Sequence, residues 1–270
     1  MNISVDEKNI KEFVNDSISS ITLGKRNIEN DRYHHNCRYS DAPSIVKNGI
    51  LSLYDINTKQ GNKIYEKGLI YLFELSALEV LGKNTEIIVK HSIDKGIFCK
   101  IDKPVTSDEV SKIKKVMQEK VKEALPFKKI ETSKSEAIEY FKSIKREDKV
   151  RTLFYNTSNF VTLYQLDDMY NYIIGDLPND TSILKYFDLS LIKDKGIVVR
   201  FPSIYDNGQV KKYTHHENYF NSLEEYSTWG NNLNINNLGE LNDFIINNNA
   251  GEIAINAAYA PLFFNITDEI

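Results

Sequence analysis

The strongest constraint on the fold is the stretch from Ile64 to Leu81, where apolar side chains would lie on every face of a helix. Residues 69–73 are apolar without a break, and more apolar residues follow up to Leu81. Gly82 comes next, and glycine commonly ends a helix because it adopts a left-handed backbone without strain. A surface helix keeps one polar face, so this pattern predicts a buried central helix. The rest of the chain must provide elements that cover it.

The composition supports a folded core of this kind. The chain has 270 residues, of which 41% are hydrophobic and 27% charged, as in ordinary globular proteins. At about 150 residues per domain this predicts about two domains, or one long one. No apolar run approaches the ~18 residues of a membrane span, and the acidic and basic residues near the start do not suit a signal peptide. We therefore predict a cytoplasmic protein with no membrane partner. Cys37 and Cys99 are too few for a disulfide framework.

Two capping boxes predict two amphipathic helices in tandem. Thr106 stands three residues before Glu109, and Ser133 stands three residues before Glu136, which is the spacing for reciprocal hydrogen bonds at a helix start. Apolar residues behind the first box recur at helical spacing.

Strands are expected on both sides of these helices. Alternation and turn residues predict an N-terminal hairpin over residues 3–13 and strands at 86–89, 96–101, 152–155, 160–164, 170–174 and 197–201. The chain then turns helical and rich in asparagine from Glu217 onward, with a last helix at 252–265.

Charge is unevenly distributed along the chain. Residues 89–151 carry 17 basic and 11 acidic side chains, whereas residues 203–270 carry 2 basic and 9 acidic ones. The basic middle segment could meet an anionic ligand, and the alternative is a set of solvated helix faces. The net charge of −4 gives no general argument for nucleic-acid binding.

The common catalytic motifs are missing. The sequence contains no G-x-x-x-x-G-K-[ST] phosphate loop, no G-x-S-x-G elbow and no H-E-x-x-H zinc motif. His34, His35 and Cys37 lie close together, but neighbouring strand residues point to opposite faces, and no second pair stands at zinc-site spacing. The cluster at His215 and His216 has the same weakness. We predict no metal site and no cofactor.

The turn from His91 to Cys99 brings an imidazole, a hydroxyl, an ammonium and a thiol within nine residues. A histidine here could act as an acid or base, and a lysine could bind an anion. A surface hairpin with a buried cysteine is the structural alternative. Tyrosine rings and an arginine elsewhere suit a nucleobase or a phosphate. The candidate ligand-binding residues are His91, Ser92, Lys95, Cys99, Tyr170, Tyr172 and Arg200.

Several short segments, taken in order, resemble the N-terminal part of bacterial uridine kinase-like nucleoside kinases. They are residues 55–65, 88–99, 125–127 (Leu-Pro-Phe), 147–151, 187–189, 199–202, 229–230 (Trp-Gly) and 237–242. The resemblance implies an α+β protein in three parts. Residues 1–56 would form a small β-grasp-like unit. Residues 57–202 would form an antiparallel-sheet and helix domain like the editing (second additional) domain of threonyl-tRNA synthetase. Residues 203–270 would be an acidic, helical connector.

Two departures from the resembling proteins limit what is carried over. Their P-loop kinase domain would follow residue 270, so the catalytic domain is absent from this chain, which is either the front part of a longer protein or a free-standing version of it. The synthetase editing domain is expected to hold zinc with an HxxxH pair and a CxxxH pair. The positions that correspond to these ligands here are Lys67, Tyr71, Ile173 and Leu177. None of them suits zinc, whereas Gly175 in the second pair's loop is retained.

Three functions follow as expectations. The first is a non-catalytic binding or regulatory region of a nucleoside kinase whose parent protein transfers phosphate from ATP, with a nucleoside, nucleotide or tRNA as ligand. The second is a metal-independent hydrolase of aminoacyl-tRNA or a small ester that uses the 91–99 region. The third is a free-standing synthetase-derived module that binds tRNA.

Overall fold

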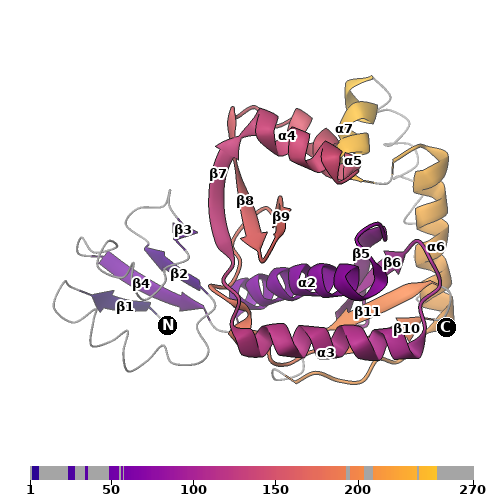
Figure 1. Ribbon diagram of the computed structural model, residues 1–270, viewed down its shortest axis with the longest axis horizontal. Coiled ribbons are helices and arrows are strands. Elements are labelled where there is room, and N and C mark those ends of the chain that lie inside the picture. The colour runs from indigo at the N-terminus through magenta and orange to yellow at the C-terminus, as the bar shows by residue number, and fades with distance from the viewer. Residues whose placement is uncertain are drawn as a thin grey trace, which may run out of the picture. The chain divides into compact units, whose positions relative to one another are not determined.

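The computed structural model describes residues 2–5, 24–27, 34–35, 49–54, 56, 58–192, 195–203, 209–235 and 237–247 (Figure 1). The chain divides into two compact units. The first comprises Met1–Ile130 and Leu163–Thr214, and the second comprises Glu131–Thr162 and His215–Ile270. Helices and antiparallel sheets occur together, so the predicted α+β class is confirmed. No helix in the described ranges combines the length and apolar character that a bilayer crossing requires.

The predicted buried helix is α2, Lys59–Leu81. Its first turn is capped by the Thr58 hydroxyl, which accepts a hydrogen bond from the Gly61 amide, and it ends at Gly82 with φ 103°. Side chains on all sides of its second half are buried, including Leu69, Leu72 and Phe73. The apolar run therefore determines both the element and its place in the core.

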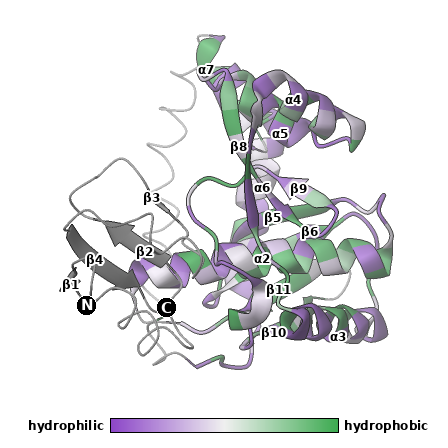
Figure 2. Cartoon of the chain, turned by 60° about the vertical axis from the view of Figure 1, so that its left-hand side comes forward, coloured by the Kyte–Doolittle hydropathy of each residue, from purple (hydrophilic) through white to green (hydrophobic). Residues whose placement is uncertain are grey.

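A four-stranded antiparallel sheet belongs to the same core. Its order is β10 (Asp188–Ile192), β11 (Gly196–Arg200), β6 (Gly96–Ile101) and β5 (Ile87–Ile93). All residues of β11 are buried. Helix α3 (Ser107–Glu123) begins with the predicted capping box and packs against α2 and β10. Figure 2 shows hydrophilic and hydrophobic residues interspersed along α3, as its amphipathic pattern predicts.

Four short strands precede α2. Their order is β1 (Asn2–Val5), β4 (Gly49–Tyr54), β2 (Gly24–Asn27) and β3 (His34–His35), and each neighbouring pair is antiparallel. The second arm of the expected hairpin, at residues 10–13, lies outside the described residues. The β-grasp-like unit and the boundaries 1–56, 57–202 and 203–270 stay predictions.

Helices dominate the second unit. They are α4 (Lys134–Ser143), which carries the second predicted capping box, α5 (Glu147–Phe154), α6 (Glu217–Asn232) and α7 (Leu238–Ile246). Helix α5 packs against both α4 and α7. At the α5–α7 contact the Arg151 guanidinium forms an ion pair with Asp243, and Gly239 lies so close to Arg151 that a Cβ would stand 2.4 Å from the arginine Cβ.

A third sheet has the order β7 (Lys128–Ser133), β8 (Phe160–Leu166) and β9 (Met169–Asn171). By the division given above, β7 and β8 each have residues in both units.

Some sequence expectations are wrong. Residues 152–154, expected in a strand, belong to α5, because a short apolar run does not distinguish strand from helix. The strand expected at 170–174 ends at Asn171. Strands β7 and β10 are not among the expected strands. None of the residues of β7 is fully buried, so its sequence lacks the alternation that marks a half-buried strand. The last expected helix, at 252–265, lies outside the described residues.

Candidate functional site

The four positions that the resemblance assigns to the synthetase metal ligands, Lys67, Tyr71, Ile173 and Leu177, all lie in the first unit. Lys67 and Tyr71 lie one turn apart on α2. The Lys67 Nζ donates a hydrogen bond of 2.7 Å to the carbonyl oxygen of Ile174. The Tyr71 hydroxyl lies 2.8 Å from the Tyr164 carbonyl oxygen and 2.7 Å from that of Met169, and both carbonyls accept from it. Both helix positions therefore hold the chain that runs through β8, β9 and the following loop.

Three consecutive loop residues are each held by a different side chain. Ile174 is held by Lys67, as described. The Gly175 carbonyl accepts a 2.9 Å hydrogen bond from the Tyr164 hydroxyl, and the Asp176 carboxylate lies 3.6 Å from the Lys129 Nζ. The three side chains come from α2, β8 and β7, so the loop is fixed on several sides.

Tyr164 is central to this arrangement. Its ring lies 5.7 Å from the Lys129 Nζ, which suits a cation–π contact. Burial, and then the charge of Asp176, raise the pKa of its hydroxyl, although a hydrogen bond from the Leu177 amide opposes this. The hydroxyl therefore stays protonated at neutral pH and can donate to Gly175.

A metal does not fit at these four positions. The ammonium of Lys67 repels a cation, the Tyr71 hydroxyl is used by two carbonyls, and the aliphatic Ile173 and Leu177 have no lone pairs. Among the described residues, no group of three or more His, Cys, Asp or Glu side chains is arranged to hold a metal ion. The side chains of His34 and His35, and Cys37, lie outside the residues that the structure describes.

The turn from His91 to Cys99 forms part of the β5–β6 hairpin. Cys99 is fully buried, and burial, with the Glu74 carboxylate second, raises the pKa of its thiol well above the usual value. Arg200 is also buried and forms an ion pair with Asp94. A ligand at the surface of this hairpin would meet Ser92 and Lys95, which are exposed, but not Cys99.

The remaining candidates, His91, Tyr170 and Tyr172, have different surroundings in the structure. The His91 ring packs against Phe98, with 5.5 Å between ring centroids. Tyr170 lies on β9, and Tyr172 directly precedes the loop at 173–177, and both are half-buried. Whether any of the seven predicted residues touches a ligand stays a prediction.

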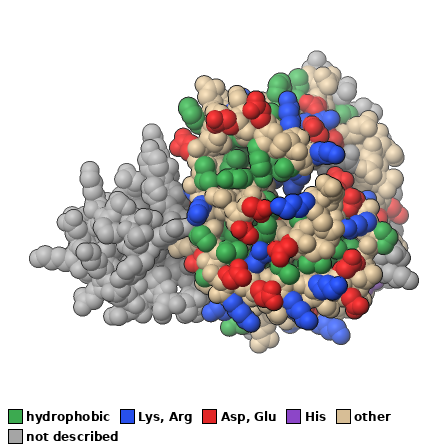
Figure 3. All heavy atoms as spheres, viewed as in Figure 1, with side chains coloured by type: hydrophobic (Ala, Val, Ile, Leu, Met, Phe, Trp, Pro, Cys, Tyr) green, Lys and Arg blue, Asp and Glu red, His purple; other side chains and the backbone are tan. Residues whose placement is uncertain are grey.

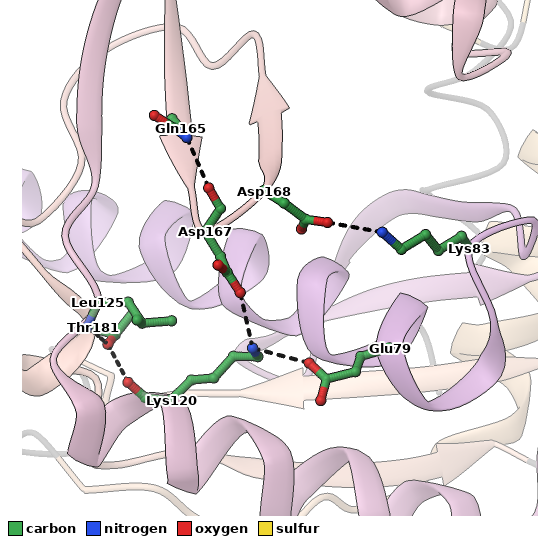
Figure 4. Close-up of polar contacts among 8 residues, drawn as sticks. All are labelled: Glu79, Lys83, Lys120, Leu125, Gln165, Asp167, Asp168 and Thr181. Atoms are coloured by element: carbon green, nitrogen blue, oxygen red, sulfur yellow. Dashed lines mark hydrogen bonds and ion pairs between the residues drawn. The ribbon is translucent and has the colours of Figure 1, made fainter.

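A second polar cluster joins α2, α3 and the β8–β9 turn (Figure 4). The Lys120 Nζ lies 3.0 Å from Glu79 and 3.5 Å from Asp167, and the neighbouring Asp168 pairs with Lys83 at 2.8 Å. Burial of the Lys120 amine works to lower its pKa, but the two carboxylates outweigh it, so the pKa is raised and the amine is charged. Sequence reasoning missed this cluster because its members lie far apart along the chain.

On the side shown in Figure 3, acidic and basic side chains of the described residues are interspersed, and these residues form no broad basic patch there. This distribution favours solvated helix faces for much of the basic segment 89–151.

Curated proteins that are similar to this chain include threonine–tRNA ligases. About half of this chain is homologous to threonine–tRNA ligases. It is 26% identical over 152 residues to the threonine–tRNA ligase of Syntrophotalea carbinolica, and 26% identical over 153 residues to that of Lawsonia intracellularis. These matches cover 55% and 56% of this chain, and 24% and 23% of the two relatives. No family model matches the chain.

The chain spans about a quarter of the length of these curated relatives. The synthetase part of the expected resemblance is therefore confirmed as a distant homology. Both relatives are threonine–tRNA ligases and neither is a nucleoside kinase, so the kinase part of the resemblance stays a prediction.

Proposed function

We propose that this chain is a synthetase-derived module that binds the acceptor end of a tRNA without hydrolysing an ester bond on it. The observation that carries the proposal is the loop at 173–177, which Lys67 of α2 and Tyr164 of β8 hold by hydrogen bonds. The four positions that the resemblance assigns to metal ligands carry no side chain suited to zinc. A site that keeps its backbone and loses its reactive groups is suited to binding.

The chemistry of the loop fits a nucleic-acid end. Lys67 and Lys129 place ammonium groups beside Ile174 and Asp176, where they can attract phosphate. The half-buried Tyr172 adjoins the loop and offers an aromatic ring on which a base can stack.

Hydrolysis has less support than binding. The metal-independent hydrolase considered above would use the thiol of Cys99, yet this thiol is fully buried and its raised pKa keeps it protonated. Catalysis by the His91–Cys99 region would therefore need a rearrangement of the β5–β6 hairpin.

The nucleoside-kinase interpretation is compatible with this proposal, because it concerns a longer parent protein of which this module would be one part. The homology favours a synthetase-derived module, and a following kinase domain would make that module its regulatory part. This chain by itself has no phosphate loop, so we expect no nucleoside phosphorylation from it.

Fluorescence anisotropy with a labelled acceptor-stem RNA tests the binding. We expect affinity that falls with added salt, and that falls roughly three- to tenfold further in Lys129→Ala. The matched control is Lys112→Ala, which removes the same charge from the exposed face of α3 and should change affinity by less than about twofold.

A deacylation assay with threonyl-tRNA tests the absence of hydrolysis. We expect release of threonine at the rate in buffer alone. Faster release that scales with protein concentration, or RNA binding that is the same in Lys129→Ala and Lys112→Ala, would overturn the proposal.

A further inference from the structure

The synthetase resemblance implies a metal that bridges a helix and a loop, but this chain joins the same two elements without suitable ligands. We infer that the ammonium of Lys67 takes over the positioning role of that metal and fixes the loop 173–177 on α2. Lys67 is then a positioning residue for the ligand, and this part of the inference rests on the proposed function.

The first support is the place of the ammonium. The Lys67 Nζ lies 2.7 Å from the Ile174 carbonyl oxygen, and it occupies the space where a side chain at position 175 would begin, 2.6 Å from an ideal Cβ. Gly175 has φ +95°, a conformation that other residues adopt only with strain. Glycine at 175 therefore provides both the backbone angle and the room for the ammonium.

The second support is that the next turn of α2 holds the strands β8 and β9, from which the loop is anchored in turn. Tyr71 donates to carbonyls of Tyr164 and Met169, while the Tyr164 hydroxyl donates to Gly175. These hydrogen bonds therefore connect α2 to β8, and β8 to the loop. A bound metal fixes such elements through shared ligands, whereas here charge-assisted and neutral hydrogen bonds to backbone carbonyls do so directly.

The third support is charge. An ammonium placed against a carbonyl oxygen satisfies the negative end of a backbone dipole, as a metal ion would. It also repels a divalent cation from the same place. The substitution of lysine at position 67 therefore replaces the metal and excludes it.

Hydrogen exchange of the Leu177 amide, followed by NMR, tests this inference directly, because that amide bonds to the Tyr164 hydroxyl at the held loop. Lys67→Met keeps the apolar stem and removes the charge. We expect the Leu177 amide to exchange at least about tenfold faster in this variant. The control is Lys63→Met, one turn earlier on α2, where the exposed lysine pairs with Glu66 on the same helix. We expect a change below about twofold there.

The Gly175→Ala substitution provides a second measurement. In the wild-type chain it displaces the ammonium and strains the backbone, whereas after Lys67→Ala only the backbone strain remains. We expect its effect on Leu177 exchange to be at least about threefold smaller in the Lys67→Ala chain. Effects of equal size in both chains would mean that Lys67 does not hold the loop.

Zinc and RNA complete the test. Zinc chloride, or EDTA, should leave Leu177 exchange in the wild type unchanged, and slower exchange with zinc would overturn the inference. Acceptor-stem RNA should bind Lys67→Met more weakly than Lys63→Met, which has lost the same charge. If no variant binds the RNA, the proposed function fails, whereas the exchange rates still decide the role of Lys67.

Discussion

The guanidinium of Arg200, on β11, forms an ion pair with the carboxylate of Asp94 at the turn of the β5–β6 hairpin. The arginine side chain is 3% exposed and the aspartate side chain is 27% exposed. Asp94 also accepts a 3.1 Å hydrogen bond from the Thr214 amide. The pair therefore connects the hairpin turn to a central strand and to the segment that ends the first unit.

Breaking this pair from its two sides should have unequal effects. Asp94→Asn leaves the buried guanidinium without its counter-charge, and we expect it to lower the free energy of unfolding by about 3 kcal/mol. Arg200→Met removes the buried charge and keeps most of the volume, so we expect a smaller loss. Urea unfolding followed by circular dichroism measures both. A larger loss in Arg200→Met would contradict the argument.

Cys99 should behave as a core residue. In a Cys37→Ser background, we expect a thiol reagent to label Cys99 only when the chain is unfolded, because the thiol is fully buried and its pKa is raised. Cys99→Ser puts a hydroxyl into an apolar place and should reduce stability by about 1–3 kcal/mol. The exposed Lys95→Ala should change it by less than about 0.5 kcal/mol. Rapid labelling of the folded protein would show that the hairpin opens.

The first capping box should make stability depend on acid. Hydrogen bonds from the Thr106 amide, and then from its hydroxyl, lower the pKa of the Glu109 carboxyl. A lowered folded pKa contributes stability above the unfolded value of about 4.3, and this contribution is lost as the pH falls through the folded pKa. Urea unfolding between about pH 3 and pH 7 should therefore show a flatter pH dependence in Glu109→Gln than in wild type. Parallel curves would contradict the assignment.

Gly68 should be intolerant of alanine although it lies inside a helix. Alanine normally stabilises a helix interior by about 1 kcal/mol relative to glycine. At this position its Cβ would lie 2.7 Å from two ring carbons of Pro178, so we expect a net loss of about 1–3 kcal/mol. Lys63→Ala, on the exposed side of the same helix, is the control and should be nearly neutral. Thermal unfolding of the two variants distinguishes overpacking from a general effect on α2.

Capping boxes and apolar periodicity predict α2 and α3 correctly, because both signals depend on residues only three or four positions apart. The α3 box forms because the partners Thr106 and Glu109 are close whatever the rest of the chain does. Helix α2 is predictable because an apolar surface on all sides can only be buried.

The same local reasoning misjudges elements whose stability comes from distant partners. Strand β7 forms because it pairs with β8, whereas none of its own side chains is fully buried. Cys99 and its neighbours on β6 are buried because that strand lies between β5 and β11, which the turn residues at 91–99 do not reveal.

The sequence by itself determined the α+β class, the buried helix, the capped helices and the unsuitability of Lys67, Tyr71, Ile173 and Leu177 as zinc ligands, because these depend on residue type and short spacing. Only the tertiary structure decided that Lys67 contacts Ile174, which is 107 residues away, and that Arg200 pairs with Asp94, 106 residues away. Contacts over such separations follow from the path of the whole chain, because no local spacing specifies which distant side chains meet and closing a loop of that length costs chain entropy that the rest of the fold must offset.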